Sequence, residues 1–193
     1  MTKPTGIIRI TLSISLLLST TMAQNQRGPE PDCHQLAAKF AAHPNQSSLD
    51  KISGPANAKC WEQIDSSNLL LAKLNNWTKN GNEWTARYLA EHLRNLDGGN
   101  LEDALIALGE FSERDMQRLL SFAHDGILST QELDNALTML PLSLSDNAPA
   151  QLRCLKLRRR KASSVTTIEL SEQKARAIAS IDNFISEVKR DNP

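Results

Sequence analysis

This chain has few aromatic residues, no long hydrophobic run after its N-terminus and no excess of charge of either sign. It contains four Phe, three Trp and one Tyr among 193 residues, so its core must consist mainly of Leu, Ile and Ala. Such a core favours packed helices over a sheet. The 22 basic and 22 acidic residues balance, which argues against a general nucleic-acid or membrane binder. Any electrostatic function must therefore come from local clusters.

The usual catalytic and cofactor motifs are also missing from the sequence. It contains no Gly-rich phosphate loop, no His-Glu-x-x-His, no Gly-x-Ser-x-Gly and no Cys-x-x-Cys. The histidines share no metal-ligand spacing; they are His34, His43, His92 and His124. We therefore expect a protein that is not an enzyme and has no cofactor, with calcium as the one candidate considered below.

The first 23 residues have the order of a secretory signal. Lys3 and Arg9 form a basic start, an apolar stretch covers 10–18, and small residues precede a cleavage site after Ala23. The apolar stretch is shorter than the roughly 20 residues that span a bilayer. We expect segment 1–23 to be removed, leaving an exported chain that is secreted or periplasmic and does not cross the membrane.

Three cysteines follow this segment, and in an oxidising compartment two of them are expected to pair. Cys33–Cys60 is the preferred pair because both residues lie in the N-terminal part, 27 positions apart. Closing a loop of this size stabilises the fold by about 3.5 kcal/mol in the chain-entropy model. Cys154 is then left over. It is reactive if exposed beside Arg153 and Lys156, and inert if buried.

Apolar residues recur at helical spacing along most of the chain, so the sequence predicts an all-α, single-domain bundle of about eight helices. We expect the C-terminal helix to be more loosely attached than the others. The expected parts are a disordered lead-in at 24–31, a helical domain at 32–141, a linker at 142–150, and a basic segment with an amphipathic helix at 151–193.

Local signals indicate where several helices begin and end. The expected boundaries are an Asp32 cap on a helix over 33–42, a loop over 45–55, a helix stop at Gly109, and capping boxes formed by Ser112 with Asp115 and by Ser129 with Glu132. A faint repeat relates 101–105 to 133–137 at an offset of 32 residues. It indicates either two helix–turn–helix units in tandem or chance similarity between two amphipathic helices.

The segment 125–133 (Asp-Gly-Ile-Leu-Ser-Thr-Gln-Glu-Leu) resembles the second half of an EF-hand loop and the start of its exit helix. The resemblance extends over 113–140 at most. It implies a calcium site whose ligands are Asp125, Ile127, Ser129 and Glu132. The first two acidic positions of the family fall on Ser121 and Ala123, however, so the site would bind calcium weakly or would have lost it. The same residues also fit a capping box after an Asp-Gly turn.

A dense basic run follows the expected linker. Its cations are Arg153, Lys156, Arg158, Arg159, Arg160 and Lys161. On a helix this run could hold lipid headgroups, a polyanion or an acidic patch of a partner; otherwise it is a solvated surface or an exposed linker. No aromatic residue is interleaved with the cations, which argues against single-stranded nucleic acid. We expect no sequence-specific nucleic-acid binding.

Taken together, these features predict an exported, non-catalytic helical binding or adaptor protein with an unknown protein partner. Two alternatives remain open at this point. One is weak calcium binding through the EF-hand-like loop, and the other is binding of an anionic surface through the basic run.

Overall fold

The computed structural model describes residues 32–57 and 59–192, which lie in a compact unit spanning Pro31–Pro193. All secondary-structure elements in these ranges are helices, which confirms the predicted all-α class. The expected signal segment 1–23 and lead-in 24–31 lie outside the described residues. Among the described helices, none combines the length and the apolar character needed to cross a membrane.

Ten α-helices and four short 3-10 helices follow one another in the described ranges, two α-helices more than the eight expected. The α-helices are α1 (Cys33–Ala42), α2 (Gln46–Ser53), α3 (Trp61–Asp65), α4 (Asn68–Lys79), α5 (Glu83–His92), α6 (Gly98–Arg114), α7 (Met116–His124), α8 (Thr130–Thr138), α9 (Ala148–Ser164) and α10 (Ser171–Asp191). The 3-10 helices are η1 (Pro55–Asn57), η2 (Leu93–Asn95), η3 (Leu142–Leu144) and η4 (Ile168–Leu170).

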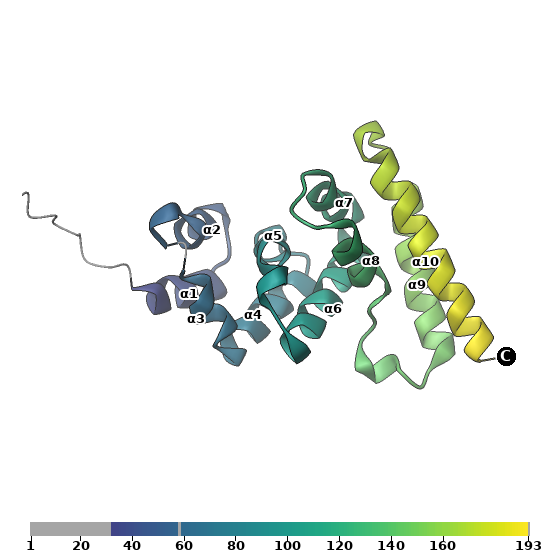
Figure 1. The fold of residues 1–193 in the computed structure, drawn as a ribbon, viewed down its shortest axis with the longest axis horizontal. Coiled ribbons are helices and arrows are strands. Elements are labelled where there is room, and N and C mark those ends of the chain that lie inside the picture. The colour runs from purple at the N-terminus through teal and green to yellow at the C-terminus, as the bar shows by residue number, and fades with distance from the viewer. Residues whose placement is uncertain (1–31, 58, 193) are drawn as a thin grey trace, which may run out of the picture. The chain divides into compact units, whose positions relative to one another are not determined.

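The helices are arranged in two layers (Figure 1). In the first layer α1, α4, α6, α8 and α10 each pack on the next, and in the second layer α2, α5, α7 and α9 do the same. Helices α4, α6 and α8 begin at residues 68, 98 and 130, so a helix pair recurs every 30 to 32 residues. This spacing supports the interpretation of the sequence repeat as tandem helix–turn–helix units, the arrangement of helical-repeat proteins.

The faint sequence repeat coincides with the contact between α6 and α8. Ala104 and Ala136 occupy equivalent places in the two repeats, and both are fully buried. The leucines that follow them, Leu105 and Leu137, are buried as well. Small side chains at one position of each unit let the helices approach closely, and the neighbouring leucines fill the space between the layers.

The N-terminal helices follow the predicted cap and disulfide. Asp32 caps α1, because its Oδ1 accepts a hydrogen bond from the backbone N–H of Gln35 at 3.0 Å. The predicted Cys33–Cys60 disulfide is present and joins the first residue of α1 to the residue before α3. Helix α1 is therefore held covalently as well as by packing on α2, α3 and α4.

The predicted loop over 45–55 is wrong, because most of it forms α2. Asn45 and Ser48 build a reciprocal capping box, with both backbone–side-chain hydrogen bonds at 3.0 Å. The short helix buries Leu49 and Ile52 against the core. The sequence does not indicate this helix, because it is mostly polar and its two apolar residues, three positions apart, are too short a pattern.

Gly109 does not end a helix as predicted; it lies buried in the middle of α6. The predicted capping box at Ser112 is also wrong, because Ser112 is fully buried inside α6 and its hydroxyl donates to the Gly109 carbonyl at 2.6 Å. Asp115 instead caps α7, accepting from the N–H of Arg118 at 2.9 Å. A glycine inside a helix costs about 1 kcal/mol relative to alanine, which a close helix contact offsets here.

The C-terminal helices form a hairpin that is firmly packed, contrary to the expectation of a loosely attached end. Helix α10 packs along α9 and also contacts α7 and α8 (Figure 1). It buries Ala177, Ile181, Ile185 and Val188. The expected linker at 142–150 contains η3, and α9 already begins at Ala148, where Asn147 caps it by accepting from the Ala150 N–H at 3.0 Å.

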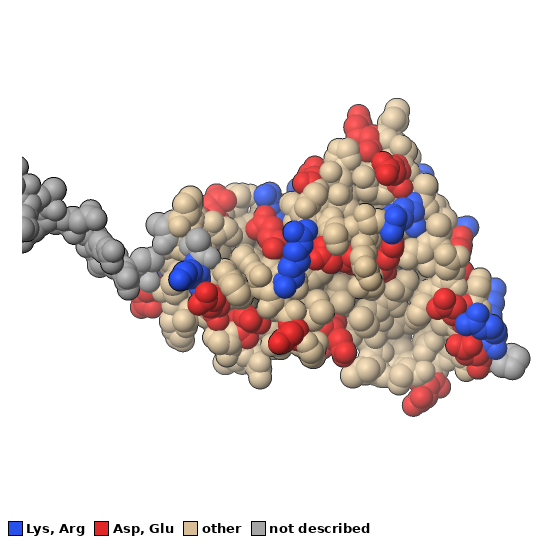
Figure 2. Space-filling model, in the orientation of Figure 1, with Lys and Arg blue, Asp and Glu red and all other residues tan. Residues whose placement is uncertain are grey.

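Charge is dispersed over the face of the molecule drawn in Figure 2. Acidic side chains are more frequent than basic ones on this face, and both are scattered among uncharged residues. Binding at this face would depend on the local shape and the few side chains in each hollow rather than on a long-range field.

Candidate functional site

The most unusual residue of the basic run is Arg158, whose side chain is completely buried on α9 (0% exposed). It lies between Leu155 and Ala162, which are also fully buried, at helical spacing. Arg158 therefore does not belong to the exposed anion-binding surface predicted from the sequence. The pattern already contained the reason: residues 155, 158 and 162 occupy one side of a helix, so an arginine at the middle position faces the core.

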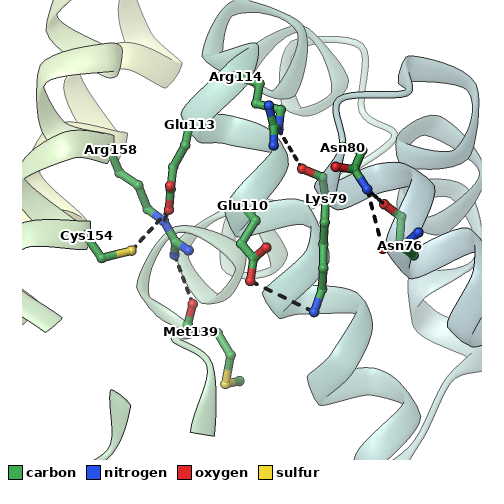
Figure 3. A network of polar contacts seen from close by, with 9 residues as sticks. All are labelled: Asn76, Lys79, Asn80, Glu110, Glu113, Arg114, Met139, Cys154 and Arg158. Atoms are coloured by element: carbon green, nitrogen blue, oxygen red, sulfur yellow. Dashed lines mark hydrogen bonds and ion pairs between the residues drawn. The ribbon is translucent and has the colours of Figure 1, made fainter. Parts of the chain in front are cut away.

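The guanidinium of Arg158 closes the C-terminal end of α8 (Figure 3). Its Nη1 donates to the carbonyl oxygens of Ala136, Leu137 and Met139 at 3.3, 3.0 and 2.9 Å. The last carbonyls of a helix have no partner within the helix and carry the negative end of its dipole. A buried cation that donates to three of them therefore stabilises this helix end.

A carboxylate from α6 completes the charge balance of this network. The Nε of Arg158 donates to Oε1 of Glu113 at 3.0 Å, which forms an ion pair between α9 and α6. Glu113 remains 23% exposed, so one member of the pair keeps contact with water. Four hydrogen bonds from Nε and Nη1 and one opposite charge offset most of the cost of burying the arginine, while Nη2 has no hydrogen-bond partner among the described residues.

Gly109 leaves the space that the guanidinium occupies. A Cβ at this position would lie 2.7 and 2.8 Å from the two terminal nitrogens of Arg158 and would overlap the carbonyl oxygen of Ala136. Glycine is therefore required by the close approach of α6, α8 and α9. This requirement explains why a residue that sequence rules read as a helix stop is kept inside α6.

Cys154 lies beside the same network and is the free cysteine of the chain. Its thiol donates to Oε1 of Glu113 at 3.1 Å. Burial raises the pKa of the thiol to about 12; the nearby charge of Arg158 opposes this, and the hydrogen bond to Glu113 reinforces it. The thiol is therefore protonated and a poor nucleophile at physiological pH, in agreement with the inert alternative considered for Cys154.

A hollow of about 400 Å³ opens next to Cys154. Lys79 and Glu110 face each other there with their charged atoms 3.9 Å apart, and Arg114 donates from Nε to the carbonyl of Lys79 at 2.7 Å (Figure 3). These contacts join α4 to α6 near the surface. Lys79 and Glu110 are thus engaged with each other, and Arg114 is engaged with a backbone carbonyl.

The remaining cations of the basic run differ in their surroundings. Arg153, Lys156 and Arg160 are exposed, follow one another along one side of α9, and take part in no ion pair among residues 32–57 and 59–192. Arg159 is exposed as well but forms an ion pair with Asp182 of α10 at 2.6 Å. Lys161 is half-buried. Within the described residues, the exposed cations of the run that form no ion pair are thus a stripe of Arg153, Lys156 and Arg160.

The EF-hand-like segment forms the turn between α7 and α8. Gly126 has a φ of +74°, as the sharp turn requires, and Leu128 is buried. Ser121 and Ala123, at the first two ligand positions, lie within α7 rather than in a loop. The structure thus has a helix–turn–helix in place of a full twelve-residue loop. Of the predicted ligands, Asp125 and Ser129 are exposed and Ile127 is half-buried.

Both carboxylate oxygens of Glu132 are occupied by the protein itself. Oε2 accepts from the backbone N–H of Ser129 at 2.5 Å, and this hydrogen bond completes the predicted capping box of α8. Oε1 lies 3.3 Å from Nε of Arg94. Burial tends to raise the pKa of Glu132, but the hydrogen bonds from Ser129 and the charge of Arg94 outweigh it and lower the pKa. In the described part of the chain, no three His, Cys, Asp or Glu side chains are grouped to hold a metal ion.

A groove that the sequence analysis missed runs between α8 and α10. It consists of two adjoining hollows of about 320 and 400 Å³, which share Thr138 and Phe184. The first is mainly apolar and is lined by Met139, Leu140, Pro141 and Leu142; the second is polar and is lined by Asp134, Arg176, Asn183 and Glu187. Only the packing of α10 against α8 brings these residues together, so no local motif could have indicated the groove.

No family model matches the chain, and neither a curated protein nor a solved structure shows significant similarity to it. The interpretation of the site therefore rests on its geometry and chemistry.

Proposed function

We propose that the protein is an exported, non-catalytic helical binding protein that engages another protein through the groove between α8 and α10. The observation that carries this proposal is the groove itself, an open hollow with one apolar and one polar half. Leu142 at its edge is 77% exposed. Binding sites typically combine an apolar surface with a few placed polar groups.

The chemistry of the remaining polar residues supports a role without catalysis. The half-buried thiol of Cys154 has a pKa raised to about 12 by burial, so it is protonated when a nucleophile would need to be ionised. Glu113 is bound by both Cys154 and Arg158. Glu132 is bound by Ser129 and Arg94. These groups hold helices together, which is a structural task.

Export is supported by the leader-like segment 1–23 and by the Cys33–Cys60 disulfide. Structural disulfides persist in oxidising compartments such as the periplasm or the extracellular space. The expected result is an extracytoplasmic protein whose N-terminus is Gln24. Intact-mass measurement of protein from its native cells tests this; an intact Met1 start would contradict it.

Photo-crosslinking in native cells tests the binding role. A photoreactive amino acid replaces Leu142 at the groove in one variant, and in the control it replaces Ile168, an equally exposed apolar residue (82%) outside the groove. We expect adducts of discrete mass from position 142 and none from 168. Equal crosslinking from both positions, or turnover of ester, peptide or peptidoglycan substrates by the purified protein, would contradict the proposal.

Binding of an anionic surface through α9 is a second candidate. It is supported by the stripe of Arg153, Lys156 and Arg160, which form no ion pair within the described residues. Charges of this kind bind acidic lipids or polyanions in a manner that salt screens.

Cosedimentation with phosphatidylglycerol vesicles at 50 and 300 mM NaCl tests the second candidate. The variant Lys156→Ala with Arg160→Ala should bind less at low salt. The control, Lys189→Ala with Arg190→Ala, removes two charges from α10 and should not. Binding that is insensitive to salt, or equally affected by both variants, would rule the candidate out.

A further inference from the structure

The groove between α8 and α10 combines two chemically different halves, and this combination indicates what kind of partner it fits. We propose that it binds a segment of a partner protein in which a large apolar side chain is followed closely by a Lys or Arg. This inference rests on the proposed binding function and adds the chemistry of the partner.

The apolar half is suited to one large aliphatic or aromatic side chain. Its hollow of about 320 Å³ is lined by Met139, Leu140, Pro141 and Leu142 from the segment after α8, and by Phe184 from α10. Leu142 is 77% exposed although it is large and apolar. Covering this side chain and filling the hollow removes apolar surface from water on both partners, which is the main source of affinity in such contacts.

The polar half has one carboxylate more than it can neutralise. Asp134 is paired with Arg176, whose Nη2 lies 2.8 Å from its Oδ2. Glu187 of α10, which lines the same hollow, is exposed and forms no ion pair within the described ranges. The uncompensated charge is negative, so the complementary group on a partner is a cation.

The two halves are close enough to be read by one short segment, because Thr138 and Phe184 line both of them. An apolar side chain in the first hollow therefore places the next residues of the same segment over the second. Asn183, exposed on α10, offers an amide that can donate to and accept from the backbone of that segment.

Selection from a random twelve-residue peptide library on the immobilised protein tests the inference. We expect enrichment of peptides with a Leu, Phe, Trp or Met within about two positions of a Lys or Arg. Affinities of the enriched peptides are then measured for two pairs of variants. Leu142→Ser is compared with Ile168→Ser, and Glu187→Lys with Glu172→Lys, each control being an exposed residue of the same kind outside the groove.

The groove variants should weaken binding by about tenfold each, and the controls should leave it unchanged. The effect of Glu187→Lys should shrink between 20 and 500 mM NaCl because salt screens the charge. Enriched peptides without a cation would overturn the inference and leave the groove as a binding site of other chemistry. Peptides whose affinity ignores both groove variants would overturn the inference and place binding outside the groove.

Two other outcomes would also overturn it. If no peptide is enriched, the groove does not bind a short segment of this kind, and crosslinking from position 142 then decides separately whether the binding function itself fails. If the protein self-associates in light scattering and Leu142→Ser abolishes the association, the groove is filled by a second copy of the chain rather than by a partner with the proposed chemistry.

Discussion

Arg158→Met tests whether the buried arginine holds three helices together. The substitution keeps most of the apolar stem but removes the hydrogen bonds to Ala136, Leu137 and Met139 as well as the ion pair with Glu113. Leaving buried acceptors unpaired costs about 1–3 kcal/mol each, and breaking a buried pair by removing one partner costs about 3–5 kcal/mol in all. Because Glu113 can hydrate, we expect a loss of about 4 kcal/mol.

Urea denaturation followed by far-ultraviolet circular dichroism measures this loss. A domain of this size should melt about 8–16 °C lower in a parallel thermal scan. The matched control is Arg159→Met, the next residue of α9, whose exposed pair with Asp182 should leave the stability nearly unchanged. Glu113→Gln should cost about 1–2 kcal/mol, and its effect should largely disappear in the Arg158→Met background, since the partner has already gone.

Equal denaturation midpoints for Arg158→Met and Arg159→Met would refute this reasoning. Such a result would mean that the helix end is satisfied by water and that the buried guanidinium contributes no net stability. A lower dependence of the unfolding free energy on urea, with an unchanged midpoint, would instead indicate that the denatured state has changed. The free energies of unfolding, each obtained as slope times midpoint, would then be compared between the two variants.

The remaining predictions concern the same helix contacts and the EF-hand-like turn. Gly109→Ala should lower the free energy of unfolding in urea by about 2–4 kcal/mol, because the new Cβ overlaps neighbouring atoms. In the control Gly99→Ala the new Cβ has no neighbour within 4 Å, so this variant should be neutral or slightly stabilising. A neutral Gly109→Ala would show that the helices can separate at low cost. Cys154, with its pKa raised to about 12 by burial, should react with iodoacetamide at pH 8 roughly 30- to 60-fold more slowly than an ordinary thiol. Alkylation at the ordinary rate would contradict the raised pKa of this half-buried thiol. Calcium at 10 mM should raise the melting temperature no more than magnesium does, because Glu132 is already bound within the protein; a shift specific to calcium that Glu132→Gln abolishes would show instead that the turn opens to bind metal.

The local structure that the sequence predicted correctly depends on forces that act over a few residues. In the caps at Asp32 and Ser129 the side chain accepts from the backbone N–H three positions further on, and both caps are confirmed. The Cys33–Cys60 pair is likewise confirmed. The missed helix α2 and the misplaced boundary at Gly109 arise where packing overrides local preference, since a core contact can stabilise a short polar helix or retain a glycine inside a long one.

The candidate sites show the same division more sharply. The basic run could be located from sequence, and the spacing of residues 155, 158 and 162 was consistent with a buried Arg158. The partners of this arginine could not be predicted, because they depend on which helices pack over it. Arg158 meets the end of α8 and Glu113 of α6, 19 to 45 positions away in the chain. The groove between α8 and α10 joins residues from two helices that are separated by a third, so no motif encodes it.

The sequence by itself therefore determined the helical class and the helix starts at Asp32 and Ser129, since composition, periodicity and caps are properties of neighbouring residues. It also indicated the Cys33–Cys60 pair, because few pairings of three cysteines are possible. Only the tertiary structure decided which polar residues are free to bind and which hold the fold together. Arg158 and Glu132 carry the same charge as exposed residues of their kind, yet Nη1 of Arg158 is bound to the end of α8, and one carboxylate oxygen of Glu132 is bound to the start of the same helix. Leu142 and Glu187, unremarkable in sequence, become a candidate binding surface because α10 packs beside α8 and leaves them uncovered.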